Sequence, residues 1–159
     1  MTENHTREIE QLFYRYAYGI DAGDFEGVAQ LLKNASIHAV DGNILAQGGL
    51  QIKQFYDKII KIHASTGTPK TQHVVSNILL KSESDGLLKA TANYSVFQKI
   101  NNDKIEAIIC GQYHSSFKPG EHGWEFYQHQ TIPLMVGDMT NHLNVSIKDI
   151  GGKTNKALK

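Results

Sequence analysis

Acid–base chemistry is the reaction type that this sequence fits best, because one carboxylate and one histidine stand in informative places. Asp21 is expected in the last turn of an apolar helix, where the helix dipole disfavours a negative charge. His73 opens the strand-like run TQHVVSNILL and shares a face with Val75, Asn77 and Leu79. A carboxylate beside a histidine fixes its tautomer and raises its basicity. If the first helix closes over this strand, the two side chains meet at roughly 2.6–3.2 Å.

Each candidate also has a structural interpretation. An acid near a helix end is most often solvated, and a histidine on an apolar strand face is most often bonded to a carbonyl in the core. Tyr16 and Tyr113 could donate a hydrogen bond to an oxygen that gains charge. Tyr16 could equally pack in the core with its hydroxyl at the rim.

Other chemistries lack their motifs. The chain has eight histidines, but no His-Glu-x-x-His or paired-cysteine spacing that would indicate a metal site. Glycine-rich phosphate loops and the G-x-S-x-G motif of serine hydrolases are absent. Nothing around the single Cys110 would lower its pKa. The sequence therefore favours chemistry that needs neither a metal nor a cofactor.

Composition indicates one soluble domain. The chain has 159 residues, with 16 basic and 16 acidic side chains, so a nucleic-acid or anionic-membrane partner is not expected. No apolar run approaches the ~20 residues that cross a bilayer, and the polar start MTENHTRE does not resemble a signal peptide. The single cysteine excludes an internal disulfide. We expect a cytoplasmic protein.

Three helices are predicted in the first half of the chain. Residues 9–32 should form two helices, with Gly23 ending the first in a left-handed conformation and Asp24 capping the second. A third helix should follow Gly48-Gly49. Its apolar stripe would contain Ile52, Phe55, Tyr56, Ile59 and His63.

Strands dominate the rest. A short hairpin is expected around Asp41-Gly42, followed after the third helix by strands at 72–80, 87–100, 104–117 and 124–132, with a loop at 118–123. This order, α-α-β-β-α-β-β-β-β, predicts an α+β cone in which a curved mixed or antiparallel sheet wraps around the helices. The domain should span 1–136. A partly flexible extension, 137–159, would contain a marginal strand at 144–147 and a frayed tail from residue 151. The core should contain Leu12, Phe13, Tyr16, Phe55, Ile59, Tyr94, Ile109, Tyr113, Trp124 and Phe126.

Three segments resemble a known family. YRYAYGIDAGDFEGVAQLL, TQHVVSN and GQYHSSF…GWEF are similar to the SnoaL-like branch of the nuclear-transport-factor-2-like (cystatin-like α+β) superfamily, over roughly residues 8–132. In that branch, scytalone dehydratase, bile-acid dehydratase and hexachlorocyclohexane dehydrochlorinase pair an Asp near the end of the first helix with a His on this strand. Those positions match Asp21 and His73, and Tyr16 matches a tyrosine of the bile-acid enzyme. Scytalone dehydratase differs, because Gln98 stands in place of its second pocket histidine, and Ile20 and Val40 replace its paired tyrosines.

The resemblance implies a cofactor-independent lyase or isomerase, dehydratase- or cyclase-like, for a small apolar or aromatic, polyketide-like compound. His73 would remove a proton next to a carbonyl, Asp21 would stabilise the charged imidazole, and Tyr16 would assist. The substrate would contact Phe55, Asn77, Tyr94, Gln98 and Tyr113.

A second interpretation remains open. The small subunits of ring-hydroxylating dioxygenases resemble the same fold without doing chemistry, so the chain could be a non-catalytic ligand-binding or assembly subunit. In either case we expect a homo-oligomer, a dimer or higher, because Phe97 and Ile108 would otherwise be exposed on the outer sheet face.

Overall fold

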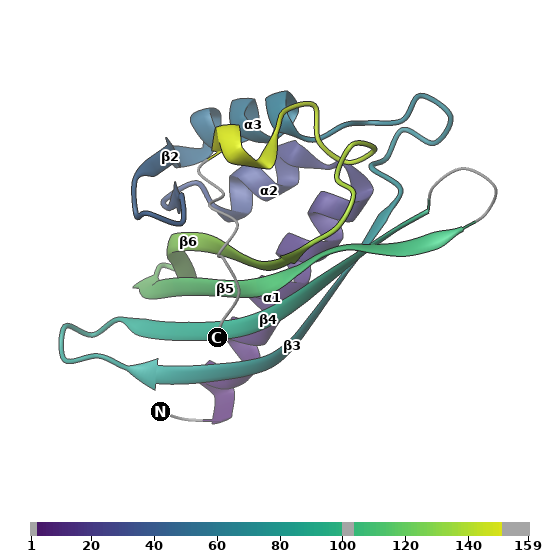
Figure 1. The fold of residues 1–159 in the computed structure, drawn as a ribbon. Coiled ribbons are helices and arrows are strands. Elements are labelled where there is room, and N and C mark those ends of the chain that lie inside the picture. The colour runs from purple at the N-terminus through teal and green to yellow at the C-terminus, as the bar shows by residue number, and fades with distance from the viewer. Residues whose placement is uncertain (1–2, 100–103, 151–159) are drawn as a thin grey trace.

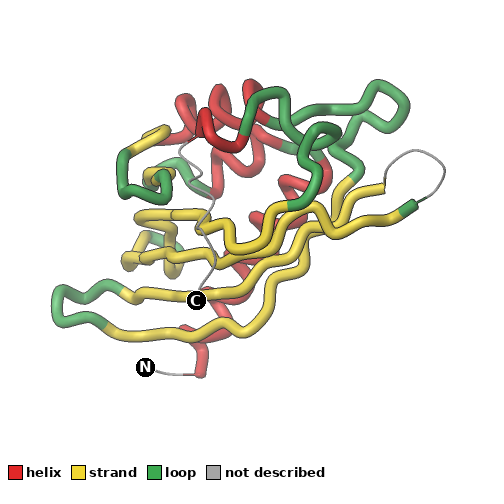
Figure 2. Tube along the Cα trace, viewed as in Figure 1, coloured by secondary structure: helices red, strands yellow, loops and turns green. Residues whose placement is uncertain are grey.

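A computed structural model describes residues 3–99 and 104–150 of the chain. Three helices and six strands of this part form one α+β unit, in which the helices lie on one side of a curved sheet (Figures 1 and 2). The helices are α1 (Glu3–Ala22), α2 (Phe25–Leu31) and α3 (Gly48–Ile59). The strands are β1 (Ser36–His38), β2 (Ile44–Gln47), β3 (Thr71–Ser82), β4 (Leu88–Lys99), β5 (Ile105–Gly120) and β6 (Gly123–Val136). A short 3-10 helix, η2 (Ile147–Ile150), follows.

The sheet is mixed, as the sequence predicts. Its strand order is β2-β1-β6-β5-β4-β3, and every neighbouring pair is antiparallel except β1 and β6. Helix α1 crosses the inner face of this sheet and contacts β3 and β6. The end of α1 therefore meets the start of β3, and the predicted α+β cone is confirmed.

The corner between α1 and α2 forms as the sequence predicts. Gly23 has a φ of 71°, which only glycine adopts without strain, and its N–H donates to the Ile20 carbonyl. Asp24 then caps α2 by accepting a 2.8 Å hydrogen bond from the Gly27 N–H. This tight corner ends α1 directly after Asp21, so the carboxylate lies at the helix end that faces β3.

The predicted core is nearly all buried; Phe55 and Trp124 are only partly so. One prediction about the outer face is wrong. Ile108 is buried, whereas Phe97 is 37% exposed. The cause is a bulge in β5, where Val96 pairs with Ile109 but Phe97 pairs with Ala107, which leaves Ile108 as the extra residue. Because the bulge shifts the alternation, Ile105 lies on the same outer face as Phe97.

Other element boundaries also differ from prediction. The expected loop at 118–123 is the end of a hairpin, since Pro119 pairs with Trp124 one rung before the turn. His63 lies beyond the end of α3, where its backbone bridges to Thr68. The expected strand at 144–147 is absent from the described residues; Leu143 makes an isolated bridge to Ile60, and η2 begins at Ile147. The expected frayed tail at 151–159 lies outside the described residues.

Candidate active site

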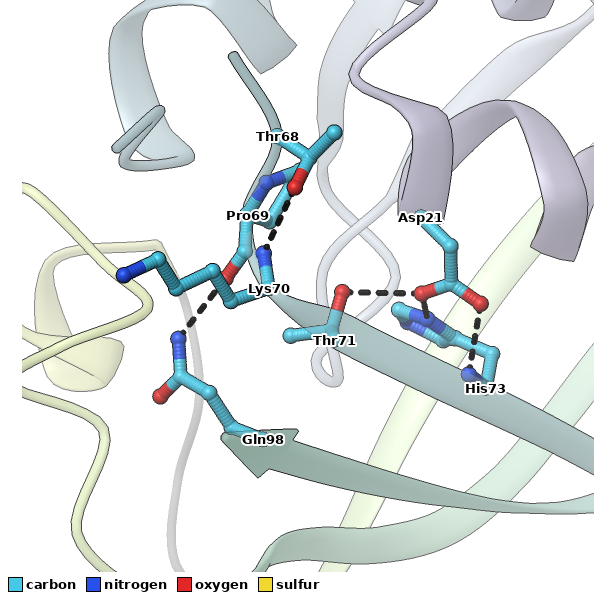
Figure 3. A network of polar contacts seen from close by, with 7 residues as sticks. All are labelled: Asp21, Thr68, Pro69, Lys70, Thr71, His73 and Gln98. Carbon is cyan, nitrogen blue, oxygen red and sulfur yellow. Dashed lines mark hydrogen bonds and ion pairs between the residues drawn. The ribbon is translucent and has the colours of Figure 1, made fainter. Parts of the chain in front are cut away.

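Asp21 and His73 meet where α1 ends and β3 begins. Oδ1 of Asp21 accepts a 2.6 Å hydrogen bond from Nδ1 of His73 and a 2.8 Å hydrogen bond from the hydroxyl of Thr71 (Figure 3). Oδ2 accepts from the backbone N–H of His73 at 2.7 Å. The predicted contact is therefore present, and the carboxylate is held by three donors from one strand.

The charge state of Asp21 follows from these contacts. Burial by itself raises the pKa of a carboxyl, but the hydrogen bonds from His73 and Thr71 and the attraction of the imidazole outweigh it. The pKa of Asp21 is accordingly lowered, and the group is ionised at neutral pH. Because an ionised carboxylate only accepts, Nδ1 of His73 carries the proton and Nε2 is left as the basic nitrogen.

The start of β3 is fixed by a second set of polar contacts. Lys70 has a φ of 58°, an uncommon conformation for a residue with a side chain, immediately before Thr71. The adjacent Pro69 carbonyl accepts a 2.9 Å hydrogen bond from the buried Gln98 amide (Figure 3). Gln98 thus anchors the turn that presents Thr71 and His73 to the carboxylate.

A cavity opens in front of His73, between the helices and the inner sheet face. Its empty volume is about 830 Å³, open mouth included. Asp21 does not line it, so the carboxylate lies behind the imidazole as seen from the cavity. The lining has no Lys, Arg, Asp or Glu among the described residues. Its side chains come from α1, α3, all six strands and the segments after β1, α3 and β6. The polar ones are Tyr16, His38, Tyr56, His73, Tyr94, Tyr113, Thr131 and His142.

Tyrosines supply half of the polar side chains in this cavity. Tyr16 and Tyr56 share a 3.0 Å hydrogen bond between their hydroxyls, and Tyr94 stacks on Tyr113 with ring centres 4.4 Å apart. Burial raises the pKa of Tyr16 to about 12, with the nearby Asp21 charge adding to the effect and the Tyr56 hydrogen bond opposing it. Burial raises the pKa of the other three as well. All four are therefore protonated donors at neutral pH.

Gly111 makes room for one of these tyrosines. A Cβ at this position would lie 2.8 Å from the Tyr94 hydroxyl and 2.2 Å from the Ile132 carbonyl, so no larger residue fits. The Tyr94 hydroxyl is buried without a hydrogen-bond partner among the described residues.

The structure separates the sequence-predicted residues into two groups. Tyr16, Phe55, His73, Tyr94 and Tyr113 all line the cavity, with Asp21 directly behind. Asn77 and Gln98, which were also predicted to contact the substrate, do not line this cavity.

The local structure explains why these two side chains lie outside the cavity. Asn77 is exposed because β3 bulges between Ser76 and Leu79, and its φ of 52° turns the strand. The strand alternation that placed Asn77 beside His73 stops there. Nε2 of Gln98 donates hydrogen bonds to the backbone carbonyls of Pro69 and Asn141.

Sequence reasoning also missed several cavity residues. Tyr56 was visible only as part of the apolar stripe of α3, and its hydroxyl pairing with Tyr16 needed the fold to be known. His38 lines the cavity with both ring nitrogens already bonded, to Ser36 and to the Gly42 carbonyl. His142 lies in the predicted extension, where no pattern pointed to it.

No three His, Cys, Asp or Glu side chains converge to hold a metal ion within residues 3–99 and 104–150. Over the same ranges, no helix is both long and apolar enough to span a membrane. The chemistry that the cavity side chains themselves can supply is proton transfer by His73 and hydrogen bonding by neutral hydroxyl and imidazole groups.

The family to which this protein belongs follows from comparison with known proteins. The SnoaL-like domain family matches residues 4–128, so the chain belongs to that family. No curated protein matches the sequence.

Solved structures agree on the fold. An NTF2-like protein with a cystatin-like fold from Novosphingobium aromaticivorans superposes with a TM-score of 0.68 at 19% identity, covering 82% of each chain. A candidate scytalone dehydratase from the same organism gives a TM-score of 0.63 at 19% identity, covering 84% of this chain and 86% of that one. ActVI-ORFA from Streptomyces coelicolor gives 0.65 at 17% identity, covering 80% and 96%. At these identities the likeness shows a shared fold.

Proposed function

We propose that this protein is a cofactor-independent lyase or isomerase, dehydratase- or cyclase-like, for a small, neutral, mostly apolar carbonyl or hydroxy compound. The observation that carries the proposal is the Asp21–His73 pair in the wall of an apolar cavity. A structural histidine does not need a partly buried carboxylate with three donors behind it. A base that must become positively charged during a reaction does.

The proton transfer can be written with the residues present. Nε2 of His73 takes a proton from a carbon next to a carbonyl, and the electron pair of that C–H bond moves into an enolate. Asp21 stabilises the resulting imidazolium through Nδ1–H. A neutral tyrosine of the cavity, Tyr16, Tyr94 or Tyr113, donates a hydrogen bond to the enolate oxygen.

Three outcomes follow from the same enolate. If a hydroxyl stands on the next carbon, the electron pair forms a C=C bond, the C–O bond breaks, and the imidazolium returns its proton to the leaving oxygen as water. If a C=C bond extends the enolate and the imidazolium returns its proton to the far carbon, the product is an isomer. If the enolate carbon attacks a second carbonyl, a C–C bond closes a ring and the resulting alkoxide takes the proton from the imidazolium. In each case His73 ends the cycle neutral.

The chemistry of the cavity supports a neutral substrate. No cation lines it within the described residues, so a carboxylate or phosphate group would be buried without a counter-charge. The aliphatic and aromatic side chains around the tyrosines favour an apolar or aromatic skeleton, including a polyketide-like one.

The elementary step is testable before the natural substrate is known. Acetophenone has one carbonyl and an adjacent methyl group, whose protons exchange for deuterium when a base removes them. We expect the protein to accelerate this exchange in deuterated water, as followed by proton NMR, and His73→Ala to abolish the acceleration. His114→Ala is the matched control, because His114 is exposed on β5 and does not line the cavity. If neither acetophenone nor a wider set of neutral ketones is exchanged, the non-catalytic ligand-binding or assembly subunit becomes the better account.

We also propose that the protein self-associates through the outer face of the sheet. Val74, Phe97, Ile105 and Met135 are exposed there on four neighbouring strands. Apolar side chains grouped across a sheet face are typical of an interface. Sedimentation should show a dimer or larger species at micromolar concentration, and a stable 17.7 kDa monomer would contradict the proposal.

A further inference from the structure

The segment after β6, residues 137–150, completes the cavity although it lies beyond the part of the chain that the family matches. It turns back from the sheet and runs beside α3 (Figure 1). Met139, His142, Leu143, Ile147 and Ile150 of this segment all line the cavity. The family match, which ends at residue 128, therefore does not account for this part of the site.

The backbone around His142 is held from both sides. The Asn141 carbonyl accepts 2.9 Å hydrogen bonds from the Gln98 amide and from Nε2 of His63. The His142 carbonyl accepts a 2.8 Å hydrogen bond from the Lys61 N–H. Since Gln98 also holds Pro69 before β3, one buried side chain fixes the approach to His73 and the position of His142.

His142 itself is buried but unsatisfied. Its exposure is 6%, and Nδ1 is enclosed without a hydrogen-bond partner among the described residues. Its ring centre lies 6.5 Å from that of His73. An enclosed N–H without an acceptor is less favourable than an enclosed lone pair, so the proton belongs on Nε2. His142 is then a hydrogen-bond donor beside the basic histidine.

The charge of His142 supports this role. Burial lowers its pKa to about 4; His73 and His63 also lower it, while Asp21 opposes them. The ring is neutral at neutral pH. A neutral imidazole can stabilise a developing oxyanion by donating a hydrogen bond without competing with His73 for the proton.

We propose that His142 is a substrate-binding residue whose Nε2–H donates a hydrogen bond to the carbonyl oxygen adjacent to the carbon that His73 deprotonates. The proposal rests on the proposed function and narrows it, because it requires a ligand oxygen on the side of the cavity formed by residues 137–150. The alternative is that His142 only fills space in the wall. Against it stands Nε2, for which no hydrogen-bond partner occurs among the described residues and whose N–H would then be left unused.

The test compares two probes of similar shape, acetophenone and ethylbenzene, which differ by the carbonyl oxygen. Their dissociation constants are measured by NMR titration for the wild type, His142→Phe and His38→Phe. His38 is the matched control, because it lines the same cavity with both ring nitrogens already bonded within the protein. Circular dichroism checks that each variant is folded.

In His142→Phe, we expect acetophenone to bind roughly five- to tenfold more weakly relative to ethylbenzene than in the wild type, which corresponds to the loss of one hydrogen bond. In His38→Phe the ratio of the two dissociation constants should stay at its wild-type value. An unchanged ratio in His142→Phe overturns the role of His142, while the exchange assay with His73 still decides the proposed function separately. If neither probe binds at millimolar concentration, the cavity is not the site and both proposals fall.

A second measurement does not depend on the variant folding. In the wild type, the ¹⁵N resonance of His142 Nε2 should move when acetophenone is added and stay unchanged with ethylbenzene. Equal responses to both probes would overturn the proposal.

Discussion

His73 on β3 and His129 on β6 both lie on the sheet, and each ring is bonded through Nδ1 to one polar side chain. For His73 the partner is the Asp21 carboxylate, at 2.6 Å. For His129 it is the Ser115 hydroxyl, at 2.9 Å, and the ring packs among Tyr16, Tyr113 and Phe126. Only His73 lines the cavity.

The difference shows what separates a reactive histidine from a structural one in the same fold. Burial lowers the pKa of His129 to about 3, and no opposite charge compensates, so this ring stays neutral. His73 has an ionised carboxylate to stabilise its charged form and a cavity from which to take a proton. Both residues are histidines on strands of the same sheet, so the polar partner and the access to the cavity decide the role.

The largest expected effect is the loss of proton transfer in His73→Ala. General acid–base catalysis typically contributes about 10²–10⁴ in rate, so the exchange rate of a substrate should fall by that factor. The fold should persist, because Asp21 keeps the Thr71 hydroxyl and the backbone N–H of residue 73 as donors. Proton NMR of the exchange, with circular dichroism as the folding control, checks both statements. Wild-type rates in this variant would remove the distinction between the two histidines.

The converse variant, His129→Ala, should affect stability and leave the rate of proton transfer nearly unchanged. Removing a fully buried ring that contacts three aromatic side chains leaves a cavity that costs on the order of 3 kcal/mol. Urea unfolding measures the loss, and the exchange assay is run at a temperature where the variant is folded. A large loss of rate with little loss of stability would show that His129 acts in the reaction.

Much of this comparison was accessible from the sequence, because its determinants are local. The apolar stripe of α1, the left-handed position of Gly23 and the cap at Asp24 place Asp21 at a helix end. The strand alternation around His73 then predicts that its ring points inward. The pairing of these two residues, distant in the chain, needed only the right order of elements.

The rest depends on interactions that no local pattern records. A bulge in β3 turned Asn77 to solvent, and one in β5 buried Ile108. In a bulge, two residues of one strand lie opposite a single residue of its partner. Neither the composition nor the length of the segment marks this position, so a strict alternation of faces misses it. Gln98 donates to the carbonyls of Pro69 and Asn141, 29 and 43 residues away in sequence. His142 lines the cavity from a segment after β6 in which no sequence pattern singled it out.

A smaller effect is expected when the partner of His73 is changed. Asp21→Asn keeps the shape and one acceptor oxygen but removes the charge that stabilises the imidazolium. A hydrogen bond to a charged group contributes about 1.5–3 kcal/mol, which corresponds to roughly a 10- to 100-fold loss of rate. The same exchange assay measures it. Ser115→Ala, which removes the partner of His129, is the matched control and should leave the rate within about twofold of wild type.

The smallest effect is a pH dependence of stability that belongs to the structural histidine and to His142. Their pKa values fall on folding, from 6.5 to about 3 for His129 and about 4 for His142. Below pH 6.5 the unfolded chain therefore binds protons that the folded protein does not, so stability is full above pH 6.5 and falls with decreasing pH. Each group contributes a slope of at most about 1.4 kcal/mol per pH unit.

Urea titrations between pH 6.5 and pH 4.5 measure this slope. His129→Phe should remove about half of it, because one of the two neutral buried rings is gone, whatever its stability at neutral pH. Asp21 does not interfere, since its lowered pKa means that its contribution is lost only below 3.8, at more acidic pH than the window used. A slope that is unchanged in His129→Phe would mean that the ring of His129 accepts a proton in the folded protein. The contrast with His73 would then rest on access to the cavity alone.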